Sequence, residues 1–215
     1  MSGYNVSELV KSVKVLLDRN QDSNSLIEND SDTLTQSQLI ESKLLDAAKL
    51  IELNAPGYLL DGESLTSQDI ELSDGVASFV LPETLLRILN VRMSDWETNG
   101  KIIQESDAEY QWQGNKCVRG TPEKPIAAIV HSESGLSVEL YSCNDESATL
   151  EKFTFVEIPY ISNGKINISE KLKEAIVYMT GALVCVSLGD NEKASNFTNI
   201  AYRLAGIIEP SQTQQ

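Results

Sequence analysis

Residues Ile126–Tyr141 read IAAIVHSESGLSVELY, and this stretch decides the class of fold that the sequence predicts. An apolar run, Ile126–His131, is followed by the polar turn Ser132–Gly135 and by a second run, Leu136–Tyr141, in which apolar and polar residues alternate. Alternation with a period of two is typical of a strand with one buried face, and two such runs across a short turn indicate a β-hairpin. The centre of the chain is therefore expected to be rich in β-structure.

The same pattern continues on both sides of this hairpin. Further strands are expected at Val76–Leu81, Leu86–Met93, Lys101–Gln104, Glu109–Gln113 and Leu150–Ile158. Pro82 separates the first two strands and Pro159 follows the last one, as turn residues do between short strands. The middle of the chain is expected to form a sheet or a sandwich.

Helical spacing of apolar residues replaces this pattern towards both ends of the chain. Four helices are expected, at about residues 6–19, 35–54, 169–188 and 191–205. Asn5 with Glu8 is a candidate capping box, Pro56 ends the second helix, and Ser169 is expected to cap the third. The residues expected on the buried faces of the last two helices are Leu172, Ala175, Ile176, Met179, Leu183, Val186, Ala194, Phe197, Ile200, Ala201 and Leu204.

The element order predicts an α+β fold, in which the N- and C-terminal helices form one helical bundle and a β-rich sheet or sandwich is inserted between them. A chain of 215 residues is long enough for one core with an insertion. The expected domains are residues 1–57 and 165–206 for the bundle, 58–164 for the β-rich insertion, and 207–215 for a polar C-terminal tail.

The chain is strongly acidic. It has 32 acidic and 17 basic residues, which give a formal net charge of −15. Because nucleic-acid recognition depends on cations that neutralise phosphates, a DNA-reading function is not expected. A negative wall can still surround DNA without binding it, because it repels a polyanion.

The start of the sequence does not resemble a signal peptide. Met1–Asn5 and the residues that follow lack its basic and apolar regions, so synthesis in the cytoplasm is expected. The longest uncharged apolar stretch, Ala175–Gly189, is shorter than the ~20 residues that cross a bilayer and is expected to be a buried helix. Cys117, Cys143 and Cys185 are odd in number and widely separated, so we expect reduced core residues.

No motif in the sequence predicts catalysis. The chain has one histidine, His131, and it lacks a phosphate-binding glycine loop, a nucleophile elbow, a zinc-protease motif and a dinucleotide fingerprint. The Asp and Asn residues between Asp18 and Asp32 lack the central glycine of a calcium loop. We therefore expect no enzyme activity, no metal and no cofactor, although the sequence leaves open an Asp/Glu pair for glycoside hydrolysis, whose spacing is three-dimensional.

Aromatic residues suggest an alternative of a different class. Tyr110 and Trp112 would share one face of the expected strand, and together with Trp96 they could stack on a sugar. This pattern is typical of a carbohydrate- or receptor-binding module, but it also occurs in ordinary cores and interfaces.

Several segments resemble the head-to-tail adaptor, or connector ring, proteins of short-tailed bacteriophages, including ring proteins of crAss-like phages. The resemblance rests on VSELVKSVKVLLDRN (6–20), ESKLLDAAKLIELNAPG (41–57), FVLPETLLRILNVRMSDW (79–96), EYQWQGNKCVRGTPEKPIAAIV (109–130), GLSVELYS (135–142) and ISEKLKEAIVYMTGALVCVSLGDNEKASNF (168–197). It covers most of the chain.

The resemblance implies a structural virion protein at the head-tail junction. In such proteins, copies assemble as a dodecameric ring that docks on the portal, extends the DNA channel and joins the capsid to the tail. The implied partners are other copies of the chain, the portal and tail or other ring proteins, while DNA passes without specific binding. No membrane partner is implied.

Apolar residues near the ends of the expected elements are candidates for the contacts of such a ring. They are Leu26, Ile27, Tyr58, Leu59, Leu60, Ile207 and Ile208. Each of them could equally belong to ordinary local packing.

Overall fold

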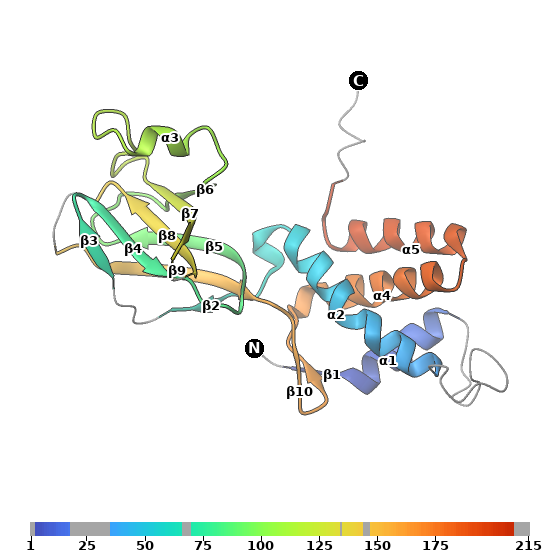
Figure 1. The fold of residues 1–215 in the computed structure, drawn as a ribbon. Coiled ribbons are helices and arrows are strands. Elements are labelled where there is room, and N and C mark those ends of the chain that lie inside the picture. Colours follow the sequence, from blue (N-terminus) through green and yellow to red (C-terminus); the bar gives the residue numbers. More distant parts are fainter. Residues whose placement is uncertain (1–2, 18–34, 66–69, 134, 144–146, 209–215) are drawn as a thin grey trace, which may run out of the picture. The chain divides into compact units, whose positions relative to one another are not determined.

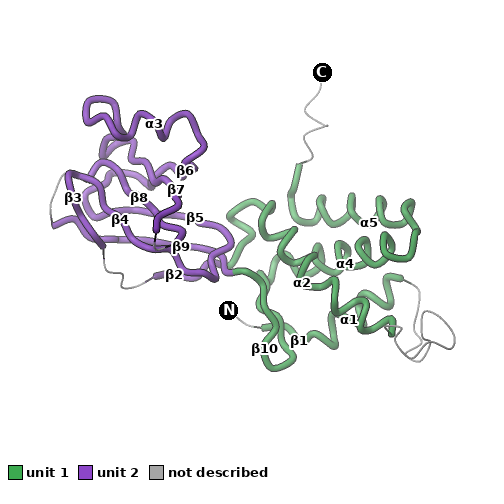
Figure 2. Tube along the Cα trace, in the orientation of Figure 1, with its two compact units in different colours: residues 1–61, 158–215 green, residues 62–157 purple. Residues whose placement is uncertain are grey.

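The computed structural model of the protein describes residues 3–17, 35–65, 70–133, 135–143 and 147–208. These residues form five α-helices and three β-sheets (Figure 1). The chain divides into two compact units (Figure 2). We call residues 1–61 with 158–215 the helical unit, and residues 62–157 the β unit.

The helical unit is organised around one central helix. Its helices are α1 (Val6–Leu16), α2 (Gln36–Asn54), α4 (Lys173–Ser187) and α5 (Asn191–Leu204), with the 3₁₀ turns η1 (Gly57–Leu59) and η2 (Glu170–Leu172). Helix α4 packs against α1, α2 and α5. A helix covered on several sides buries most of its surface, which explains why α4 is apolar on nearly all faces.

Glycine in α4 permits a close approach between helices. A Cβ atom added to Gly181 would lie 2.9 Å from Cδ2 of Leu16 and 3.3 Å from Cδ2 of Phe197. A larger side chain would therefore push against both α1 and α5.

The helix ends are held by side-chain caps. Thr35 and Gln38 form a reciprocal capping box at the start of α2, and Asp190 accepts a hydrogen bond from the Lys193 N–H at 3.1 Å. Asn5 caps α1 through the Ser7 N–H at 3.0 Å rather than through Glu8. The expected cap at Ser169 is wrong, because its side chain makes no cap hydrogen bond with η2.

The helical unit also contains a small antiparallel sheet in the order β1-β11-β10. Its strands are β1 (Tyr4–Asn5), β10 (Ile161–Ser162) and β11 (Lys165–Ile166). The turn between β10 and β11 has positive φ at Asn163 and Gly164, as two-residue hairpin turns require. Lys173 Nζ lies 4.9 Å from the centroid of the Tyr4 ring, so this sheet contacts the first turn of α4.

The β unit contains two sheets that share one core. The five-stranded sheet has the order β3-β4-β8-β7-β6 and the other has the order β2-β9-β5. The strands are β2 (Glu63–Ser64), β3 (Glu71–Ser73), β4 (Val76–Val80), β5 (Leu85–Met93), β6 (Lys101–Gln104), β7 (Ile126–Ser132), β8 (Gly135–Tyr141) and β9 (Leu150–Glu157). The predicted hairpin of Ile126–His131 with Leu136–Tyr141 is confirmed by the antiparallel pairing of β7 with β8.

The short helix α3 (Tyr110–Gln113) lies in the β unit, where the sequence predicted a strand. Gln113 is buried; its Nε2 donates to the Glu109 carbonyl at 2.9 Å, and its Oε1 accepts from the Gly120 N–H at 3.1 Å. These local hydrogen bonds satisfy the backbone in a helical turn, so no strand partner is needed. The predicted strand at Glu109–Gln113 is therefore wrong.

The predicted architecture, a bundle of terminal helices that flanks a β-rich middle, is also wrong. The described residues have a mixed α+β arrangement, because α3 lies in the middle of the chain and β1, β10 and β11 lie in the helical unit. The small sheet forms because Tyr4 pairs with Ile166, which is fully buried and anchors the start of the chain. A two-residue strand carries too little periodicity to be recognised in a sequence.

Some residues expected to be buried are exposed. Val186, Ile200 and Leu204 are exposed because the main packing partner of α5 is α4 alone, and Val186 lies in the last turn of α4. Cys143 and Cys185 are buried as expected, whereas Cys117 is exposed. Among the described residues, no helix combines the length and the apolar character that crossing a bilayer requires.

Candidate functional site

Two of the predicted interface segments lie side by side in the helical unit. A Cβ atom added to Gly206 would lie 3.5 Å from Cγ of Pro56, 3.6 Å from Oη of Tyr58 and 3.7 Å from Cδ1 of Leu59. The segment that follows α5 therefore runs along the segment that follows α2. We call Tyr58, Leu59, Ile207 and Ile208 the terminal patch.

The side chains of the terminal patch differ in exposure. Tyr58 is 73% exposed and Ile208 is 80% exposed, while Leu59 and Ile207 are half-buried. Leu60 is buried and belongs to local packing rather than to this surface. The other two interface candidates, Leu26 and Ile27, lie outside the described residues.

Backbone contacts hold the terminal patch in place. The Tyr58 carbonyl accepts a hydrogen bond from Lys171 Nζ at 3.0 Å, which ties η1 to η2. Gly206 has φ +64, the left-handed conformation that commonly ends a helix, and the Ile207 N–H donates to the Tyr202 carbonyl at 2.9 Å. The exposed side chains therefore project from a fixed backbone.

The two units differ in charge. The β unit has 17 acidic and 7 basic residues, while the helical unit has 15 acidic and 10 basic residues. Two thirds of the net negative charge is therefore carried by the β unit. Two helical units repel each other less than two β units do at the same separation.

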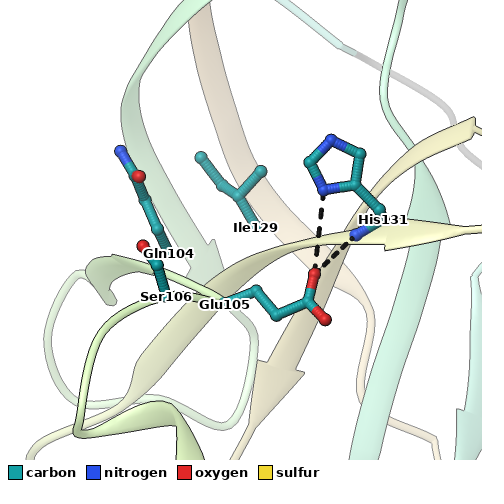
Figure 3. Close-up of a pocket in the computed structure, with 5 residues that line it drawn as sticks. All are labelled: Gln104, Glu105, Ser106, Ile129 and His131. Carbon is teal, nitrogen blue, oxygen red and sulfur yellow. Dashed lines mark hydrogen bonds and ion pairs between the residues drawn. The ribbon is translucent and has the colours of Figure 1, made fainter.

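A shallow depression of about 400 Å³ lies in the β unit at one end of β6 and β7. It is lined by Gln104, Glu105, Ser106, Ile129 and His131 (Figure 3). Gln104 pairs with Ile129 in the parallel β6–β7 ladder, and His131 follows Ile129 by two residues, so these three side chains project from one face of the sheet. Ile129 also packs against the core that the two sheets share.

Glu105 and His131 are paired across the depression. Glu105 Oε2 accepts a hydrogen bond from the His131 backbone N–H at 3.3 Å and lies 3.7 Å from His131 Nδ1. The Glu105 N–H donates to the Ile129 carbonyl at 3.0 Å and so continues the ladder beyond β6. The carboxylate is therefore positioned by backbone contacts on both strands.

Three residues that line the depression have the side-chain types of a catalytic triad. Glu105 lies close enough to His131 to orient the imidazole, as the acid of a catalytic triad does. The hydroxyl of Ser106, however, lies beside Gln104, away from the imidazole (Figure 3). These three residues therefore do not form a triad.

The three aromatic residues of the alternative interpretation do not form one surface. Trp96 is 2% exposed and belongs to the core of the β unit, whereas Trp112 on α3 is 59% exposed. The Tyr110 hydroxyl donates to Glu139 Oε2 at 3.2 Å, and the same oxygen accepts from the Tyr141 hydroxyl. The pKa of Tyr110 is raised above its usual value. Burial is the larger cause, and the negative charge of the nearby Glu139 carboxylate is the second. Trp112 is the member of the set that presents an open ring.

A buried carboxylate on α2 joins three segments of the helical unit. Glu52 on α2 is 2% exposed, and one of its oxygens accepts the Ser169 N–H at 2.6 Å. The Ser169 hydroxyl oxygen accepts the Asp61 N–H at 3.1 Å, and Asp61 in turn accepts the Glu170 N–H at 2.9 Å. Ser169 therefore ties α2 to the start of η2 instead of capping a helix.

The depression and the Glu52 network were not predicted from the sequence. Gln104 is the last residue of a predicted strand, and Glu105 and Ser106 directly follow it, which is a usual place for functional side chains. The parallel pairing of β6 with β7, which brings them to His131, gives no signal in the sequence. His131, the single histidine of the chain, is the one residue of this site that the sequence singles out.

Comparisons with known proteins do not indicate a function for this chain. No family model matches the chain, and no curated protein matches it significantly. Within the described ranges, no group of three or more His, Cys, Asp or Glu residues is placed to hold a metal ion.

Proposed function

We propose that this protein is a structural virion protein, a head-to-tail adaptor whose copies form a ring on the portal, extend the DNA channel and join the capsid to the tail. The observation that carries the proposal is the terminal patch, where exposed Tyr58 and Ile208 project from anchored backbone segments. An exposed aromatic residue beside exposed aliphatic residues is typical of the centre of a protein interface.

Other exposed apolar residues of the helical unit support an assembly role. They are Leu50 and Leu53 on α2, and Ile200 and Leu204 on α5. Specific interfaces bury about 800 Å² on each partner, so the interface is expected to extend beyond the four residues of the terminal patch. These helix residues supply further apolar area in the same unit.

The acidic balance supports a role around DNA. A surface with the net charge of the β unit repels phosphates, so a duplex can slide past it without adhering. The proposed partners are other copies of the chain, twelve in number by resemblance, together with the portal and tail or other ring proteins. The proposed location is the head-tail junction of a virion, after synthesis in the host cytoplasm.

The experiment that tests this proposal measures whether copies associate and bind the portal. Sedimentation velocity of the purified chain, alone and mixed with the portal protein of the same virus, should give a complex of many copies on the portal. Folded chains that remain monomeric in the presence of folded portal would contradict the proposal.

The carbohydrate- or receptor-binding alternative is favoured by one observation, the exposed ring of Trp112. A sugar that stacks on this ring should change tryptophan fluorescence, and Trp112→Phe should abolish the change because Trp96 is buried. A saturable response of this kind would favour the alternative. The adaptor proposal expects no response.

A further inference from the structure

We propose that the depression between β6 and β7 binds the guanidinium group of an arginine side chain that a partner protein presents. The site is concave, and its volume of about 400 Å³ lies within the range of small-ligand sites. It belongs to the β unit, whereas the terminal patch belongs to the helical unit, so it goes beyond the contacts proposed for the ring.

Hydrogen-bond acceptors in the depression lack partners among the described residues. Glu105 uses Oε2 for His131 and leaves Oε1 open. The side-chain amide of Gln104 and the hydroxyl of Ser106 make no hydrogen bond to another described residue. The side-chain oxygens of Gln104 and Ser106 lie together, and the Glu105 carboxylate lies beside His131, so a ligand in the depression has three separate acceptors to reach (Figure 3).

The charge of the site favours a cation. Among the lining residues that the structure describes, Glu105 is the one carboxylate, and none is a lysine or an arginine. The β unit that surrounds it has ten more acidic than basic residues, which lowers the energy of a bound cation and raises that of an anion. Phosphates, sulfates and carboxylates are therefore poor candidates.

The shape of the site favours arginine over other cations. Ile129 lies between Gln104 and His131 and offers an apolar floor for an aliphatic stem (Figure 3). The oxygens stand apart, so they suit the planar guanidinium, which has five donors in fixed directions, better than a compact ammonium. The nearby imidazole of His131 can stack on the guanidinium plane or accept from it.

The test uses His131 as a reporter, because it is the single histidine among 215 residues and gives one Hε1 signal in proton NMR. The full chain, without a histidine tag, is titrated at pH 8 with N-acetyl-L-arginine amide. A saturable shift of this signal is expected, with a dissociation constant on the order of 10 mM, as suits one isolated side chain. N-acetyl-L-glutamine amide and N-acetyl-L-glutamate amide should give no saturable shift, and the lysine analogue should bind more weakly.

Two variants make the result specific. Glu105→Gln removes the carboxylate and should weaken arginine binding by about tenfold or more, since hydrogen bonds to charged groups are the strong ones. Glu133→Gln removes the same charge from an exposed position in the same hairpin and should bind as the parent does. Absence of a saturable shift, equal shifts with all four compounds, or unchanged affinity in Glu105→Gln would each overturn the proposal and leave the adaptor proposal intact.

Discussion

The Glu52 carboxylate is the residue whose burial has the clearest thermodynamic consequence. Burial raises its pKa above the usual glutamate value, the hydrogen bonds from Ser169 act in the opposite direction, and the Asp61 charge raises it further. A glutamate with a raised pKa in the folded state binds protons more tightly there than in the unfolded chain. The stability that this group contributes is therefore complete below about pH 4.3 and is lost as the pH rises through the folded-state pKa.

The variant Glu52→Gln should remove the loss of stability that Glu52 causes as the pH rises. The glutamine Oε1 can still accept the Ser169 N–H, while the buried charge is gone. We expect the variant to be at least as stable as the parent at pH 7, and its free energy of unfolding to fall less between pH 5 and pH 8. Urea unfolding at several pH values, followed by circular dichroism, measures both quantities.

Two comparisons control this experiment. Glu174→Gln changes an exposed glutamate on α4 and should leave the difference between pH 5 and pH 8 as in the parent. Glu52→Ala leaves the buried Ser169 N–H without an acceptor and should destabilise the protein by about 1–3 kcal/mol. A Glu52→Gln protein with the parent's pH dependence would show that the carboxylate is not buried as described.

At the scale of elements, the packing of Trp96 depends on the turn that follows β5. A Cβ atom added to Gly100 would lie 2.7 Å from Cζ3 of Trp96 and 3.2 Å from Cγ1 of Val91. The Gly100 N–H also donates to the Val91 carbonyl at 2.8 Å, which fixes the turn against the strand. Backbone and ring therefore leave no room for a side chain at this position.

Gly100→Ala should destabilise the β unit by about 1–3 kcal/mol, because Trp96 must move within a close-packed core. Gly114→Ala is the matched control, since a Cβ atom there meets nothing within 4 Å and its backbone is already right-handed. The control should be as stable as the parent or slightly more stable. Equal stability of the two variants in urea unfolding would contradict the position described for Trp96.

Elements with a long and regular pattern could be predicted from the sequence. The β7–β8 hairpin has six alternating residues in its second strand, and α2 has a complete capping box before a regular apolar stripe. Helix α3 could not be predicted, because Tyr110 and Trp112 fit a strand pattern and the hydrogen bonds of Gln113 that favour a helical turn are specific to the folded chain. The β1–β11 pairing is similarly short and joins residues about 160 positions apart.

The candidate sites also depend on contacts that exist only in the folded chain. Tyr58 and Ile208 could be singled out because they are apolar residues beside helix ends, but only the structure brings their segments together at Gly206. The depression depends on a parallel strand pair and on the face from which His131 projects. Neither the parallel pairing nor the direction of the His131 side chain can be predicted from the spacing of residues in the sequence.

At the scale of the whole molecule, the terminal patch is expected to mediate association. The double variant Tyr58→Ser with Ile208→Ser should weaken self-association, or binding to the portal, by about tenfold or more, because such residues at an interface centre contribute most of the binding energy. Val118→Ser, which changes an exposed apolar residue of the β unit, is the control and should associate as the parent does. Sedimentation equilibrium measures the association constants of both variants. Equal weakening in the double variant and in Val118→Ser would show that the terminal patch is not the site of association.

The charge of the assembled molecule predicts an unusual response to salt. If copies associate as proposed, each brings a β unit with a net negative charge to the assembly, and salt screens the repulsion between such units over about 10 Å at 0.1 M. Association should therefore strengthen when the salt concentration rises from about 50 to 300 mM. Weaker association at higher salt would indicate an interface held by opposite charges instead.

The most direct test of the adaptor proposal is negative-stain microscopy of the purified chain mixed with the portal of the same virus. We expect a ring of additional density, coaxial with the portal, that is absent from images of the portal alone. A chain that stays unbound while both proteins are folded, or that is found in the virion away from the vertex through which the genome leaves, would contradict the proposal. The chain imaged alone does not decide the matter, since adaptor copies can close into a ring only when the portal is present.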